Sequence, residues 1–125
     1  MILLQIALGG AIGAVLRYLT VLGAREVFGP SFPLGTLIAN TAGSFAMGIL
    51  TVLLIERGGE ARALSPALMT GVLGAYTTFS AFALDTATLW EDGREGAAAL
   101  YAGASVGLSL AALAAGLVLA RSLAQ

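Results

Sequence analysis

Four long apolar stretches separated by short polar connections dominate the pattern of the chain. They run from Met1 to Leu22, from Phe32 to Ile55, from Ala63 to Leu84 and from Gly96 to Ala120. Each has roughly the 20 residues that an α-helix needs to cross the hydrocarbon core of a bilayer. The pattern predicts an all-α integral membrane protein with a single membrane domain over residues 1–125, whose four spans lie near residues 2–22, 33–55, 64–89 and 97–120.

The third stretch carries polar residues and helix breakers at its centre. Gly71 to Phe82 combines two glycines, a run of hydroxyl side chains and two phenylalanines, and no charged residue occurs between Ala63 and Leu84. Such residues are tolerated at bilayer depth mainly where they face protein, water or a bound ion. We therefore expect the third helix to be interrupted and to form a site.

The second and fourth stretches each carry polar residues spaced four apart, which places them along one helix face. Interhelical packing is one interpretation of these stripes, and serines in a span often bond to their own helix. Asn40 favours a second interpretation, because its amide offers two donors to a dehydrated anion. The members are Thr36, Asn40 and Ser44 in the second stretch, and Tyr101, Ser105 and Ser109 in the fourth.

Small residues and one arginine mark the first stretch. Gly9 and Gly13 have the spacing that lets helices approach closely, and Gly103 and Gly107 repeat it in the fourth stretch. Arg17 lies far inside its span, where a charge is costly unless it snorkels, pairs or lines water. Snorkelling to the nearby helix end and an anion-attracting vestibule both remain open for it.

Composition narrows the class of protein. The chain is 58% hydrophobic and 10% charged, with a mean hydropathy of +0.95, against roughly 25% charged residues in soluble domains. It has no Cys and no His, which removes thiol chemistry and the usual transition-metal ligands. The first stretch lacks the basic start and cleavage site of a signal peptide. We expect a multi-pass protein of the plasma (inner) membrane with no catalytic residues and no nucleic-acid partner.

The arginines are nearly balanced between the two ends of the predicted helices. Four spans place both termini and the Glu56 to Arg62 loop on one face, and counting basic residues near helix ends gives no clear bias. Either a small bias fixes one orientation, or copies insert both ways and assemble antiparallel. The arginines counted are Arg57, Arg62 and Arg121 on one face, and Arg25 and Arg94, with Arg17 nearby, on the other.

Three motifs in order make this sequence similar to one known family. They are GGxxGAxxRY from Gly9 to Tyr18, GTLxxNxxGSFxxG from Gly35 to Gly48, and GxxGxxTTFSxF from Gly71 to Phe82. With them, the chain resembles the Fluc (CrcB-type) family of small fluoride channels over nearly its whole length. The one departure noted is position 81, an alanine where relatives often have a hydroxyl residue, which puts one polar donor in doubt.

The resemblance implies an antiparallel, dual-topology homodimer with two pores. It also implies that the break in the third helix sits at the dimer centre, where the backbone carbonyls of Gly74 and Thr77 hold a structural sodium ion. Hard cations prefer oxygen ligands, and a two-fold axis turns two ligands into four. Phe79 and Phe82 correspond to the pair beside the permeating anion, and their electropositive ring edges face an anion without trapping it.

The function implied is passive fluoride efflux that lowers cytoplasmic fluoride. Arg17 would draw anions in, and Asn40, Thr36 and Ser80 would replace part of the water shell. Phe79 and Phe82 would line the narrow path, with Tyr101, Ser105 and Ser109 as further donors.

Two other functions fit the size and charge balance. A proton-coupled exporter needs a carboxylate embedded in the membrane, whereas the first span has none and Asp85 lies near a span end. A non-transporting assembly subunit would use the polar stripes only for packing.

Overall fold

The computed structural model describes all 125 residues, and it is helical throughout, with no β-strand. Four helical segments are long and apolar enough to cross a membrane: Ile2–Phe28, Leu34–Glu56, Gly59–Glu91 and Glu95–Leu123. The predictions of an all-α fold and of four membrane-capable helices are confirmed.

The second and third segments are built from several helical elements. The full order is α1 (Ile2–Phe28), α2 (Leu34–Leu50), the π-helical η1 (Thr51–Glu56), the 3-10 helix η2 (Gly59–Leu64), the π-helical η3 (Pro66–Leu73), α3 (Gly74–Tyr76), α4 (Phe79–Glu91) and α5 (Glu95–Leu123).

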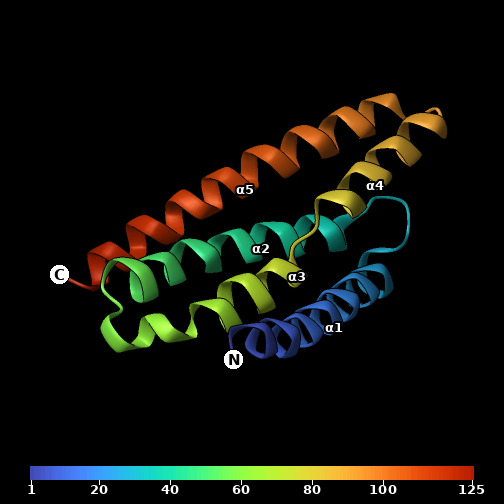
Figure 1. The fold of residues 1–125 in the computed structure, drawn as a ribbon. Coiled ribbons are helices and arrows are strands. Elements are labelled where there is room, and N and C mark those ends of the chain that lie inside the picture. Colours follow the sequence, from blue (N-terminus) through green and yellow to red (C-terminus); the bar gives the residue numbers. More distant parts are fainter.

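The helices form one elongated bundle (Figure 1). The N-terminus, the C-terminus and the connection between η1 and η2 lie towards one end, and the α1–α2 and α4–α5 connections lie at the other. At the first end Arg121 pairs with Glu56 at 2.5 Å, and Arg57 donates to the carbonyl of Ala124. Because the pair is exposed, it contributes little to stability. It shows, however, that the C-terminus lies close to the connection between η1 and η2, which was expected on the same face of the membrane.

The third segment changes neighbours halfway along its length. Its first half, η3 and α3, packs on α1, whereas its second half, α4, packs on α5. Between the halves, Thr77 and Thr78 have extended backbones, with φ/ψ of −87°/156° and −153°/127°. In Figure 1 this step carries the chain across α2, from the side of α1 to the side of α5.

Glycines allow the close approach of α1 and η3. A Cβ atom on Gly9 would collide with the carbonyl oxygen of Ala67, and one on Gly13 with that of Val72. Backbone atoms cannot move aside as a side-chain tip can, so these positions admit only glycine. The packing interpretation of Gly9 and Gly13 is confirmed.

The equivalent expectation for the fourth span is wrong within this chain. No atom lies within 4 Å of a Cβ built on Gly103 or Gly107. The close contact between α2 and α5 occurs instead where Gly48 meets the backbone around Leu113 to Leu117, and where Gly116 meets Phe45. Spacing alone identifies a possible contact face but not the face that a neighbouring helix covers.

Several helix ends differ from the sequence-based limits. α1 runs past Leu22 to Phe28, and it stops at Gly29, whose φ of 84° favours glycine. The stretch Glu56 to Arg62, expected to be a loop, is largely helical, because η1 extends to Glu56 and η2 begins at Gly59. Charged residues are compatible with the end of a helix, so a helix can be longer than the apolar run that predicts it.

Few side chains are buried in a single copy. Only 18 of the 125 residues are buried, and large apolar side chains are exposed along α1 and α5. The main cluster of buried apolar residues consists of Leu89, Ala98 and Tyr101, with Phe32 and Phe82 packed against it. An apolar exterior of this kind suits a chain surrounded by lipid or by another copy.

Candidate functional site

The break in the third segment is held by hydrogen bonds from its own threonines. The Thr77 backbone N–H donates to the carbonyl of Leu73 at 3.0 Å, which closes the last turn of the first half. The Thr77 hydroxyl donates to the same carbonyl at 2.9 Å. At the start of the second half, the Thr78 hydroxyl accepts from the N–H of Ala81 at 3.2 Å, and so caps α4.

Asn40, from the middle of α2, pairs with the backbone of the break. Its Nδ2 donates to the carbonyl of Thr78 at 3.0 Å, and its Oδ1 accepts from the Thr78 N–H at 2.7 Å. Both polar groups of one extended residue are thereby satisfied by a single side chain. One of the two Nδ2 hydrogens is spent on this contact, which leaves one for a ligand.

The opposite side of the break is held by α1. The Arg17 Nε donates to the carbonyl of Ala75 at 3.1 Å, and Thr20 shares a hydrogen bond of 2.9 Å with the hydroxyl of Tyr76. A cation at this place complements the negative C-terminal end of the preceding helical turns. Arg17 is therefore paired with the backbone through its Nε, and its role toward anions stays a prediction.

A groove of about 370 Å³ lies beside the break. α2, α4 and α5 contribute to it, and it brings together the two phenylalanines and most of the polar stripes. Phe79 stands at its open side and is 78% exposed. The lining residues are Asn40, Ser44, Thr77, Thr78, Phe79, Phe82, Ser105, Val106, Ser109 and Leu110.

Aromatic rings continue from this groove toward the α1–α2 connection. Phe79 and Phe82 have ring centroids 5.4 Å apart with planes at 65°, and Phe82 lies 5.5 Å from Tyr101. Tyr101 in turn meets Phe32 edge-on at 5.6 Å. In such tilted arrangements the positively charged edge of one ring meets the negative face of its neighbour.

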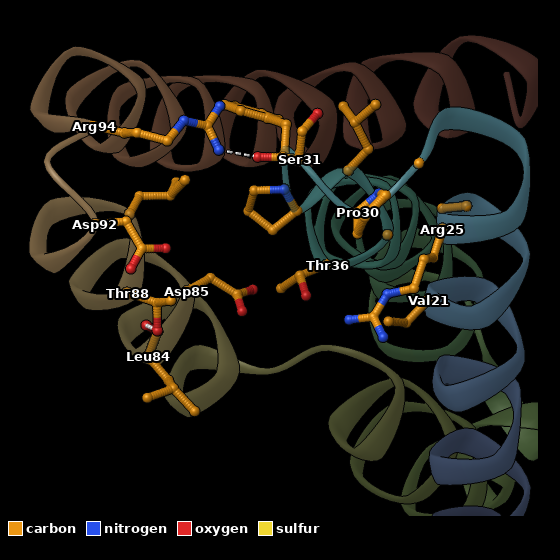
Figure 2. A pocket seen from close by; sticks show the side chains of 17 residues that line it. Val21, Arg25, Pro30, Ser31, Thr36, Leu84, Asp85, Thr88, Asp92 and Arg94 are labelled. Atoms are coloured by element: carbon orange, nitrogen blue, oxygen red, sulfur yellow. Dashed lines mark hydrogen bonds between the residues drawn. The ribbon is translucent and has the colours of Figure 1, made fainter.

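A second cavity, of about 270 Å³, opens at the end of the bundle that holds the α1–α2 connection (Figure 2). Thr36 and Asp85 point toward one another inside it, with Arg25 and Asp92 at its sides. Arg94 donates to the carbonyl of Ser31 across its rim, shown as the dashed line in Figure 2.

Tyr101 links the two cavities. It is fully buried, and its hydroxyl donates to Asp85 Oδ2 at 3.0 Å. Phe82 lies against its ring and also lines the groove. Tyr101 thus contacts one lining residue of each cavity, Asp85 of the end cavity and Phe82 of the groove.

Comparison with known proteins places the chain in a family. The family model described as "CrcB-like protein, Camphor Resistance (CrcB)" matches residues 4–117. The chain belongs to the CrcB-like family. The resemblance found from the three motifs is confirmed.

Close relatives within the CrcB-like family cover almost the whole chain. A protein of Cereibacter sphaeroides is 57% identical over 119 residues, which is 95% of this chain and 94% of the relative. One from Paracoccus denitrificans is 55% identical over 121 residues, 96% of this chain and 94% of the relative. One from Ruegeria is 54% identical over 119 residues, 94% and 93%. All three are named "Fluoride-specific ion channel FluC".

In this CrcB-like chain the predicted site residues do not all lie together. The groove collects Asn40, Phe79, Phe82, Ser105 and Ser109, together with Thr77. Thr36 lines the end cavity. The remaining predicted residues are Tyr101 between the two cavities, Ser80, exposed with its hydroxyl 3.5 Å from that of Thr78, and Arg17 and Gly74 at the break.

Sequence reasoning missed three residues of the site. Thr78 caps α4 and binds Asn40; its position just before a new helical run is the usual place of a capping threonine, and could have been recognised. Asp85 lies near a span end, as expected, but its position in the sequence gives no sign that it accepts a hydrogen bond from the hydroxyl of Tyr101. Ser44 was identified in the stripe of α2 but not assigned to the pathway, and it lines the groove.

Proposed function

We propose that this chain is the subunit of a fluoride-specific ion channel that lets fluoride leave the cytoplasm passively and so lowers its concentration there. The observation that carries the proposal is the groove beside the break. There an amide donor and serine hydroxyls line one groove with two phenylalanines whose rings are tilted against one another, in a family whose members bear that name. The protein acts as a transporter, and no step of the proposal is catalytic.

Fluoride needs replacement of a tightly held water shell, because it is small and strongly hydrated. The groove offers the second Nδ2 hydrogen of Asn40 and the hydroxyl of Ser105, which is buried with no hydrogen-bond partner. Ser109 lies one turn further along α5. Several weak donors placed one after another along the groove bind an ion less tightly than one fixed charge would. The ion can then move from donor to donor, which conduction requires.

We further propose that two copies assemble as an antiparallel homodimer with two pores. Phe79 is 78% exposed and Gly74 is exposed as well, although both belong to the centre of a membrane segment. A second copy against this face would cover both residues and close the groove on its open side. The balanced arginines favour insertion of copies in both orientations.

Insertion in both orientations is tested by the location of the C-terminus. A reporter fused after Gln125 should be detected on both sides of the plasma membrane, because neither end of the bundle has a clear excess of arginine. The measurement is reporter activity on each side in intact cells. A control chain with Arg25 and Arg94 both changed to glutamine should shift the reporter to one side; a single orientation in the unchanged chain contradicts dual topology.

We propose that a structural sodium ion binds at the centre of this dimer, to the carbonyls of Gly74 and Thr77. In an unbroken helix these carbonyls would accept from the N–H groups of Thr78 and Ala81. Those two N–H groups donate instead to Asn40 and to the Thr78 hydroxyl. Two neighbouring carbonyl oxygens freed in this way suit a hard cation, and a two-fold axis would double them to four ligands. The ion would join the two copies and support the broken backbone.

Fluoride efflux from vesicles tests the proposed channel. Purified protein in vesicles loaded with potassium fluoride should release fluoride rapidly when an ionophore opens the vesicles to potassium, because the groove provides a path without a fixed charge. A fluoride electrode measures the release. Vesicles loaded with potassium chloride are the matched control and should retain their anion. Fluoride release no faster than from protein-free vesicles contradicts the proposal.

A further inference from the structure

We infer that Asn40 and Thr78 are positioning residues of the cation site, whose side chains keep the carbonyls of Gly74 and Thr77 available. The inference rests on the sodium ion proposed above, and it assigns Asn40 a second task besides offering a donor to the anion.

The carbonyl of Gly74 lacks its helical donor. In continuous helix its partner is the N–H of Thr78, four residues on. That N–H donates to Asn40 Oδ1 at 2.7 Å, at the short end of the normal range for such bonds. The Asn40 Nδ2 binds the carbonyl of the same residue at 3.0 Å and so fixes its extended backbone. Asn40 thus takes the donor that would otherwise close the helix onto Gly74.

The carbonyl of Thr77 lacks its helical donor as well. Its helical partner would be the N–H of Ala81, which donates to the hydroxyl of Thr78 at 3.2 Å. This capping contact satisfies an N–H of the first turn of α4 and redirects it from the break. Each of the two proposed sodium ligands has therefore lost its helical donor to one identified side chain.

A third contact separates the carbonyls that bind protein from those that are free. Arg17 donates its Nε to Ala75, which lies between Gly74 and Thr77. The carbonyl of Ala75 thus accepts from a side chain of α1, and the carbonyl of Thr78 accepts from Asn40. The protein occupies these two carbonyls, which leaves the carbonyls of Gly74, Tyr76 and Thr77 for a bound cation, and both proposed sodium ligands are among the three.

The arrangement couples the cation site to the anion groove. Asn40 pairs with the break through one part of its amide and lines the groove beside Phe79 and Phe82. Its orientation toward the groove is consequently fixed by the extended backbone that the cation site requires. Aspartate keeps the acceptor for the Thr78 N–H but loses the donor for its carbonyl, and leucine loses both, so only an amide makes both contacts.

Substitutions of Thr78 test the positioning role with little change of shape. Thr78→Val removes the hydroxyl and keeps the side-chain volume, whereas Thr78→Ser keeps the hydroxyl. We measure thermal unfolding of the purified protein as sodium chloride replaces N-methyl-D-glucamine chloride at constant ionic strength. Thr78→Val should raise the sodium concentration for half-maximal stabilisation about tenfold, the usual effect of losing a group that orients metal ligands. Thr78→Ser should behave as the unchanged protein.

A control and a second variant complete the test. Thr86→Val makes the same chemical change in the same helix, at a hydroxyl that binds its own helix through the carbonyl of Phe82 at 2.9 Å. It should leave the sodium midpoint unchanged. Asn40→Leu should raise the midpoint about tenfold. If that variant does not fold, the comparison of Thr78→Val with Thr78→Ser decides alone.

Two results overturn the inference: a Thr78→Val midpoint equal to that of the unchanged protein, or stability of the unchanged protein that is the same in both cations. Fluoride efflux measured on the same preparation distinguishes failure of this inference from failure of the channel proposal. Efflux without any effect of sodium leaves the channel proposal standing and removes the cation site. A sodium effect that Thr78→Val weakens, without efflux, leaves the inference standing and removes the channel.

Discussion

Replacing both Phe79 and Phe82 by isoleucine should reduce fluoride efflux about 100-fold, which brings it close to the leak of protein-free vesicles. Isoleucine remains large and apolar but has no electropositive ring edge. If each ring stabilises a fluoride ion in the narrow part of the groove by about 1.4 kcal/mol, loss of one ring slows passage about tenfold, and loss of both slows it about 100-fold. The measurement is fluoride release from vesicles with equal amounts of protein.

The matched control for this variant is Phe28→Ile. Phe28 is 59% exposed at the end of α1, and it lines neither the groove nor the end cavity. Its replacement should leave efflux unchanged. Thermal unfolding of the double variant shows whether the fold is intact. If the double variant folds and its fluoride efflux is undiminished, the two rings do not line the fluoride path.

Replacing Gly13 by alanine should destabilise the protein strongly. The added methyl group would collide with the carbonyl oxygen of Val72 and approach the N–H of Tyr76 at 3.1 Å. α1 would have to move away from η3 and α3, which also carries Arg17 away from the carbonyl of Ala75. Overpacking of this kind costs about 1–3 kcal/mol, and thermal unfolding in detergent measures it.

Gly10→Ala is the matched control on the same helix. A Cβ on Gly10 meets no atom within 4 Å, and alanine favours helix over glycine by about 1 kcal/mol. This variant should be as stable as the unchanged protein or slightly more stable. Equal effects at the two positions would contradict the close packing of α1 on η3.

The sequence predicted the number and class of the helices because long apolar runs have few alternatives. It predicted less well where each run ends. α1 continues through Arg25 and Glu26 to Phe28, since charged residues fit the last turn of a helix as well as a loop. It was also wrong about Gly103 and Gly107, because a small-residue spacing does not identify which helix, if any, covers that face.

The groove residues follow from periodicity, but their hydrogen bonds do not. Spacing of four placed Ser105 and Ser109 on one face of α5, and both line the groove. Nothing in the spacing indicates that Asn40 binds the backbone of Thr78, which lies 38 residues away in the chain. Arg17 presents the same difficulty, because its partner Ala75 is 58 residues away. Contacts of this length depend on how whole helices cross, which local pattern does not determine.

The step at Thr77 and Thr78 also constrains the order in which the helices pack during synthesis. α4 has 13 residues, or about 20 Å of helix at 1.5 Å per residue, too little to cross a hydrocarbon core of about 30 Å. The packing partner of α4 is α5, which lies later in the chain. The packing partner of η3 and α3 is α1, which is synthesised before them. The third segment therefore completes its packing in two stages, and the second stage waits until α5 has been synthesised.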